Sequence, residues 1–265
     1  MITYYLSTKL KRPAPGGQNT DWHSDHGTHI ASFWLHKDFQ DRVIWLWQEL
    51  AKHYCDNTWI AGYNPLNEPT DPSHTRVVRF YDRIYNAIHA VDSHHTIFFD
   101  GNTFASDFSH FGESHKKWSN TAYSIHDYSL FGFPNSPELY IGTEQQHRRL
   151  RRGYEKKREW MDERGLCVWN GEWGPVYARK EYDGDKTDEI NEVRYRVLKD
   201  QLGIYNKVSP GVSVGSCAIR SNIHRTVLAG LFGCTKTSVF KGWYMSRKTR
   251  PTEHCSKIFS PRNIG

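Results

Sequence analysis

Apolar residues recur along most of the chain in two alternating patterns. Short apolar, β-prone runs that end at breakers rich in Gly, Pro or Asn predict buried parallel strands at 59–61, 96–99, 123–125 and 166–170. Segments with apolar residues at helical spacing and charged residues between them predict helices over 37–53, 74–91, 138–164 and 188–205. Because strand and helix signals alternate, the sequence predicts an α/β fold with a parallel sheet.

The two flanks of this region lack the patterns. Residues 1–13 show no clear period and carry a basic cluster, and residues 14–26 are a loop segment rich in Gly, Pro and Asn. After residue 207, a stretch rich in Gly, Ser and Val again shows no period. We therefore expect the alternation of strands and helices to hold only between these flanks.

Two carboxylic acids follow predicted strands. Glu68 lies in the segment GYNPLNEPT, where the apolar run 59–61 gives out, and Glu172 lies in WNGEWGP, at the end of the run 166–170. Two carboxyl groups on separate strand ends fit glycoside hydrolysis, in which one protonates the leaving oxygen and the other attacks the anomeric carbon or activates water. The pair is the first candidate for catalytic chemistry.

Three motifs together point to a protein family with this chemistry. The NEP around Glu68, the His126-Asp127-Tyr128 of YSIHDYSLFGFP, and the GEWG around Glu172 stand in this order at barrel-like spacing. Together they resemble glycoside hydrolase family 5, a family of (β/α)8 barrels, and the resemblance runs from about residue 14 to residue 207. A chain of 265 residues also has the usual size of one such domain.

The resemblance implies an incomplete barrel. It makes the strand before Glu68 the fourth, and the predicted strands at 96–99, 123–125 and 166–170 the fifth, sixth and seventh. The first two strands have no counterpart, the third is at best a remnant, and an arginine and a histidine usual in this family's cleft are missing. We expect a partial TIM (β/α)8 barrel, roughly strands 3 or 4 to 7, incomplete at both ends.

The resemblance also implies roles for individual residues. Glu68 would be the general acid and base, with a raised pKa, and Glu172 the nucleophile, about 5 to 5.5 Å away as in retaining enzymes. Asn67 would contact the sugar 2-hydroxyl, Tyr128 would donate a hydrogen bond to Glu172, and His126 would line the neighbouring subsite.

Three aromatic residues are further candidates for substrate contacts. Trp22 and His23 lie in a loop that borders the sugar-binding cleft in the resembling family. Trp173 either stacks on a sugar or packs under the cleft, and these alternatives stay open. Asp127 should point away from His126 and Tyr128 if the strand alternates regularly, so we leave it out of the site.

Charge is distributed unevenly. Residues 208–265 contain nine Lys or Arg against one acid, a net of +8, which leaves −2 for the remainder of a chain whose total is +6. A mildly acidic body suits neutral sugars, and aromatic residues at 14% supply flat rings for them. The arginine-rich stretch 148–152 fits a solvated helix face, so nucleic acid is not an expected partner.

No cofactor, metal or membrane partner is implied. The sequence has no Gly-rich phosphate loop and no set of His or Cys residues at ligand spacing. No apolar run approaches the length of a membrane span, and residues 1–13 lack the apolar core of a signal peptide. We expect a soluble chain that binds carbohydrate; its compartment and oligomeric state stay open.

Residues 208–265 are expected to be a mistranslated or disordered tail behind a partial catalytic domain at 1–207. Val208-Ser209 can be encoded GTAAGT, a splice donor, and His224-Arg225 can be encoded CACAGG, which contains an acceptor. Removing the bases between them shifts the frame, and the shifted reading resembles the family's eighth strand. The sequence therefore predicts no eighth strand in this chain, and weak activity or none.

The sequence leaves two alternative functions open. The first is a retaining β-glycosidase, endo or exo, acting on a β-linked glucan, mannan or glycoconjugate. The alternative is a non-catalytic, truncated remnant of such an enzyme that at most binds sugar. The intact pair of acids favours the first, and the missing strands favour the second.

Overall fold

A computed structural model describes residues 14–208 and 231–233 of the chain. The chain divides into two compact units, Met1–Thr235 and Lys236–Gly265, and all described residues belong to the first. Their main helices and strands, in chain order, are α2 (Lys37–Tyr54), β1 (Gly62–Tyr63), α3 (Arg76–His89), β2 (Thr96–Asp100), α4 (Asn102–Ala105), β3 (Thr121–Asp127), α5 (Glu144–Arg164), β4 (Val168–Trp173), α6 (Lys180–Asp183), α7 (Thr187–Val208) and β5 (Leu231–Gly233).

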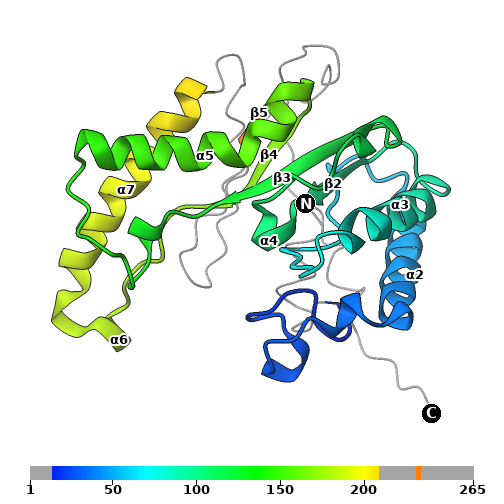
Figure 1. The fold of residues 1–265 in the computed structure, drawn as a ribbon, viewed down its shortest axis with the longest axis horizontal. Helices are drawn as coiled ribbons and strands as arrows, with labels where there is room; N and C mark the ends of the chain where they lie inside the picture. The colour runs from blue at the N-terminus through cyan, green and yellow to red at the C-terminus, as the bar shows by residue number, and fades with distance from the viewer. Residues whose placement is uncertain (1–13, 209–230, 234–265) are drawn as a thin grey trace, which may run out of the picture. The chain divides into compact units, whose positions relative to one another are not determined.

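The strands form one sheet in sequence order, from β1 to β5 (Figure 1). The pairs β1–β2, β2–β3 and β3–β4 are parallel, with a helix in each connection, and β5 pairs antiparallel with β4. Four parallel strands with covering helices make a half-barrel, so the predicted partial TIM barrel is confirmed. A further barrel strand would run parallel to β4, which β5 does not.

The sequence placed two strands imperfectly. The apolar run 59–61 is not a strand: β1 begins at Gly62, and the side chain of Trp59 is 81% exposed. β4 extends to Trp173, so Glu172 lies within the strand rather than after it. The expected properties of the tail at 208–265 concern residues that, apart from Val208 and β5, lie outside the described part of the chain.

The two faces of the sheet differ. One face packs against the helices and carries Tyr63, Ile97, Phe99, Tyr123 and Ile125, all almost fully buried in the main core. Helices α2 and α3 contact each other on this side, as do α5 and α7 (Figure 1). The opposite face holds a small apolar cluster of Phe98, Ala122 and Trp169, followed by polar residues toward the carboxyl ends of the strands.

Helix boundaries follow local chemistry. Thr143 caps α5 by accepting from the backbone of Gln146, whose side chain in turn bonds the Thr143 backbone, and Gly165 ends the helix in the left-handed conformation. On its outer face, Arg148, Arg149 and Arg151 each pair with a nearby glutamate. The prediction of a solvated, ion-paired helix face is confirmed for these three. In the described part of the chain, no helix has the length and apolarity to span a membrane.

Candidate active site

Glu68 lies in the loop that follows β1, with its side chain buried. Its backbone is left-handed, with φ of 48°, a conformation that costs a residue with a side chain roughly 1 kcal/mol or more. The backbone N–H of Glu68 donates to Oδ2 of Asp100 at 2.9 Å, and the Gln18 amide bonds the carbonyl of Asn67 beside it. These contacts, one from the end of β2 and one from the loop at 14–26, hold the strained conformation.

Asp100 ends β2 and is fully buried at the centre of this arrangement. Its Oδ1 accepts from the Asn64 amide at 2.7 Å, while its Oδ2 accepts from Glu68 and lies 3.6 Å from Nε2 of His126. Burial raises the pKa of Asp100, against the charge of His126 and the hydrogen bonds, which favour the ionised form. Sequence reasoning missed Asp100, although it is an acid at a strand end, the signal that identified Glu68 and Glu172.

Glu172 reaches the same face through an irregularity in β4. Ile125 pairs with Asn170, but the next residue of β3, His126, pairs with Glu172, so Gly171 is an extra residue in the strand. A Cβ at Gly171 would lie 2.8 Å from the Ser124 hydroxyl, so any other residue here would force that side chain to move. The bulge lets Glu172 face the interior beside His126.

The two acids meet across His126. Nδ1 of His126 lies 2.8 Å from Oε1 of Glu68 and 3.6 Å from Oε2 of Glu172. One oxygen of each acid and a nitrogen of His126 all lie within 4.8 Å of one another. Tyr128 donates to Oε2 of Glu172 at 3.0 Å, so the predicted hydrogen bond is present and His126 shares the cluster as expected.

Protonation does not follow the expected pattern. Burial alone would raise the pKa of Glu68, but the hydrogen bond and charge of His126 outweigh it and lower that pKa. The expectation of a raised pKa at Glu68 is therefore wrong for the chain without sugar. Burial and the charge of Glu68 raise the pKa of Glu172, against His126 and Tyr128. The nearby carboxylates raise the pKa of His126 to about 9, against its burial.

The sequence of the chain matches a known protein family. A family model described as Cellulase (glycosyl hydrolase family 5) matches residues 19–205. The chain belongs to glycosyl hydrolase family 5.

The chain is also similar in sequence to one curated protein. It is named Beta-xylosidase, comes from Phanerodontia chrysosporium, and is 77% identical over 194 residues. The match covers 73% of this chain and 41% of that protein, so the chain spans about two fifths of its relative's length.

Solved structures share the fold at low identity. The cellulose synthase subunit Z of Clostridioides difficile is 17% identical, with a TM-score of 0.51 over 64% of this chain and 58% of that chain. A second structure, titled a glycoside hydrolase, is 21% identical, with a TM-score of 0.53 over 67% of this chain and 55% of its own. At these identities the likeness speaks for the fold alone.

The remaining candidates of this family 5 chain separate into two groups. Trp22 is 64% exposed, contacts the ring of Phe104, and donates from Nε1 to Oε2 of Glu68 at 3.1 Å. Burial lowers the pKa of His23, and the charge of Glu68 opposes this, so His23 also lies near the acid. Asn67 is half-buried in the same loop. These three lie on the Glu68 side of the site.

Trp173 lies on the face of the sheet that packs against the helices, on the other side from the two acids. It is 5% exposed and packs edge-on against Tyr205 of α7, with ring centroids 5.6 Å apart. Of the two alternatives, packing beneath the cleft is the one present, and stacking on a sugar is not. Asp127 also points toward the helices, accepting from Lys157 and Tyr205, which confirms that it is outside the site.

Proposed function

We propose that this chain carries the catalytic pair of a retaining β-glycosidase, with Glu172 as nucleophile and Glu68 as general acid and base. The observation that carries the proposal is the approach of the two carboxyl groups, whose nearest oxygens lie within 4.8 Å. Retaining enzymes hold their carboxyl groups about 5 to 5.5 Å apart, whereas inverting enzymes need about 6.5 to 9.5 Å to admit water.

In the first step, an oxygen of Glu172 forms a bond to the anomeric carbon as the bond to the leaving oxygen breaks. Glu68 gives that oxygen a proton, and a glycosyl-enzyme intermediate remains. In the second step, water attacks the anomeric carbon, the bond to Glu172 breaks, and Glu68 takes the proton of the water. Tyr128 orients Glu172 throughout, and Asn67 binds the sugar 2-hydroxyl.

His126 supplies the proton that the lowered pKa of Glu68 would otherwise deny the reaction. Before substrate binds, the proton resides on Nδ1 of His126, 2.8 Å from Glu68, because three nearby carboxylates favour the imidazolium. When Glu172 bonds to the sugar, its negative charge disappears and the imidazolium loses part of its stabilisation. In the same step the proton passes from His126 through Glu68 to the leaving oxygen, so the pair acts as one acid.

The name of the relative supports a proposal for the substrate class. Because the 77% identical protein is named Beta-xylosidase, β-D-xylosides are the first substrates to test, ahead of β-glucosides and β-mannosides. The exposed Trp22 donates to Glu68, the proposed general acid, and would therefore contact the leaving group. An aromatic ring there would stack on a sugar or other flat leaving group.

A mechanism-based label tests the proposal. A 2-deoxy-2-fluoro-β-xyloside with an activated leaving group should add one sugar mass to the peptide that contains Glu172, and Glu172→Gln should prevent the labelling. Glu68→Gln should lower kcat on an unactivated β-xyloside by about 10²- to 10⁴-fold. Labelling at another carboxylate, or an inverted product by NMR, would contradict the assignment.

A chain that binds sugar without turnover is the second candidate, because β5 runs antiparallel to β4, where the next strand of a barrel would run parallel. Saturable sugar binding with neither turnover nor labelling would favour it over the enzyme. We also propose that residues 208–265 are not family sequence, which is supported by a family match that ends at residue 205. Genomic DNA without GT at Val208-Ser209 and AG at His224-Arg225 would refute the splicing explanation.

A further inference from the structure

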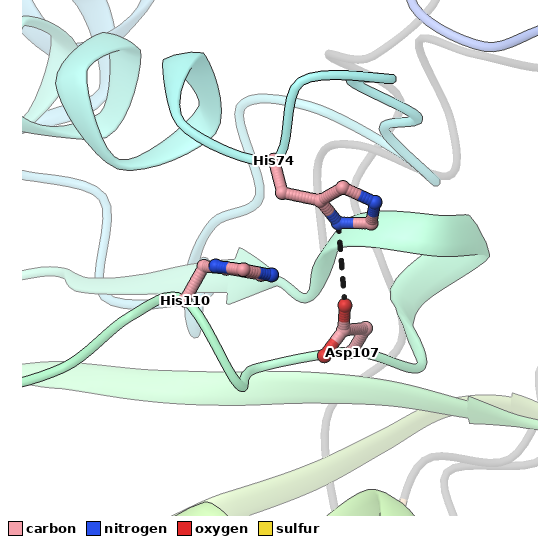
Figure 2. A group of neighbouring side chains, drawn as sticks. All are labelled: His74, Asp107 and His110. Carbon is pink, nitrogen blue, oxygen red and sulfur yellow. Dashed lines mark ion pairs between the residues drawn. The ribbon is translucent and has the colours of Figure 1, made fainter.

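A second cluster of ligating side chains lies apart from the two acids. His74 comes from the loop between β1 and α3, while Asp107 and His110 come from the loop between α4 and β3. Figure 2 shows the three side chains turned toward one another. One ligand atom from each lies within 4.8 Å of the others.

The hydrogen bonds of Asn102 determine the state of the His74 ring. The Oδ1 of Asn102 accepts from the backbone of Asp71 at 2.8 Å, and its Nδ2 donates to the Asp71 carbonyl at 3.1 Å. These contacts fix the amide so that Nδ2 also faces Nδ1 of His74 at 2.9 Å. Because Nδ2 is a donor, Nδ1 must present its lone pair.

Asp107 faces the same nitrogen. Its Oδ2 lies 3.5 Å from Nδ1 of His74, which is too long for a hydrogen bond, and the lone pair offers no proton to share (Figure 2). A carboxylate oxygen thus lies next to a ring nitrogen that carries no proton, and the two electron-rich atoms repel each other; the His110 ring is 4.9 Å from that of His74. A cation among the three groups would remove this repulsion.

We propose that His74, Asp107 and His110 bind a divalent transition-metal ion, with zinc the best match. Two ligand atoms on a tetrahedral ion, at bonds of about 2.0 to 2.1 Å, lie about 3.4 Å apart, close to the separation of His74 and Asp107. Two imidazoles and a carboxylate are ligands that zinc accepts, with water in the fourth position. On binding, Nδ1 of His74 turns from the Asn102 amide to the ion, while Asn102 keeps its bonds to Asp71.

The ligands are held in place by backbone contacts that do not need the ion. The N–H of Asn102 donates to the Asp107 carbonyl at 2.8 Å, and the N–H of Asp107 donates back at 2.9 Å. The N–H of Ser109 donates to Oδ1 of Asp107 at 2.9 Å, which leaves Oδ2 directed at His74. The N–H of His74 itself bonds the Asp71 carbonyl at 3.0 Å.

The ion would have a structural role. It would join the loop that carries Glu68 to the loop that follows α4, and Phe104 of α4 contacts Trp22 of the catalytic site. No residue of the catalytic pair is among its ligands, so binding does not depend on the glycosidase function. Sequence spacing gave no sign of the site, because His74 and Asp107 stand far apart in the chain.

Cobalt titration of the full, metal-free chain tests the proposal, because Co²⁺ in a tetrahedral site absorbs visible light. We expect one equivalent of Co²⁺ to produce these bands, Zn²⁺ to abolish them, and Zn²⁺ to raise Tm. His110→Ala and Asp107→Asn should each weaken Co²⁺ binding by at least tenfold, whereas His53→Ala, at an exposed histidine of α2, should leave it unchanged.

Circular dichroism shows whether each variant keeps its fold. Bands of equal strength in the wild type, His110→Ala and Asp107→Asn would assign cobalt binding to other histidines and overturn the proposal. The absence of bands in a folded wild-type chain would also overturn it. In that case His74 and Asp107 would form only a proton-dependent ion pair.

Discussion

Replacement of Asp100 by Asn tests how the acid is held in place. Both carboxylate oxygens of Asp100 accept hydrogen bonds, one from the Asn64 amide at 2.7 Å and one from the backbone of Glu68 at 2.9 Å. An asparagine offers one oxygen, so its NH₂ group must face one of the two donors. If Glu68 loses its partner, its left-handed backbone is no longer held and the carboxyl group shifts from His126.

The magnitude follows from these contacts. A hydrogen bond to a charged group contributes about 1.5 to 3 kcal/mol, and a buried donor left without a partner costs a similar amount. Asp100→Asn should therefore lower the free energy of unfolding by about 2 to 3 kcal/mol. For a domain of this size, that corresponds to a fall in Tm of roughly 4 to 12 °C.

The catalytic effect should depend on the leaving group. A displacement of Glu68 by about 1 Å should lower kcat roughly tenfold to a hundredfold on a β-xyloside with a poor leaving group, which needs the acid. Bond cleavage in a dinitrophenyl xyloside needs no acid, so its rate of glycosyl-enzyme formation should change little. Both rates are measured by stopped-flow and steady-state kinetics on the variant.

Asp92→Asn is the matched control, because Asp92 is also buried but bonds Tyr63 and His95 instead of the site. It should lower Tm and leave the ratio of the two rates unchanged. If Asp100→Asn keeps the wild-type ratio while it lowers Tm, Asp100 supports the fold only. The reasoning about Glu68 would then be wrong.

Three further changes test the rest of the site. Tyr128→Phe removes the hydrogen bond that lowers the pKa of Glu172, so the acidic limb of the kcat/KM profile should move to higher pH. The fold raises the pKa of His126 from 6.5 to about 9, so its contribution to stability is complete below pH 6.5 and is lost as pH rises through 9. Tm should fall across that range, and a flat profile would contradict the pairing. Gly171→Ala should destabilise the chain by about 1 to 3 kcal/mol and impair activity, whereas Gly153→Ala, with open space around it, should do neither.

The sequence predicted those features of the site that depend on strand alternation. His126 lies on β3 and Tyr128 is the first residue after it; both reach the acids, while Asp127 between them faces the helices. Successive side chains of a strand point to opposite faces of the sheet, and this alternation depends only on local sequence. The sequence pattern was therefore sufficient to predict which side chains face the site. The order of the parallel strands followed in the same way from the alternation of strand and helix signals.

Features that depend on contacts between strands could not be predicted. The bulge at Gly171 is a matter of register between β3 and β4, and the left-handed backbone of Glu68 depends on Asp100, far along the chain. The pKa of Glu68 likewise depends on the position of a proton on His126. Single-sequence patterns carry no information on such pairings, and this is why the expected direction of that pKa was wrong.

The bulge in β4 decides which face of the sheet carries Glu172. If β4 were a regular strand, Gly171 would pair with His126 and Glu172 with Asp127, whose side chain faces the helices. Glu172 would then point away from Glu68, and the two carboxyl groups would lie on opposite faces of the sheet. One extra residue in one strand is therefore what brings acids from two separate strands into a single site.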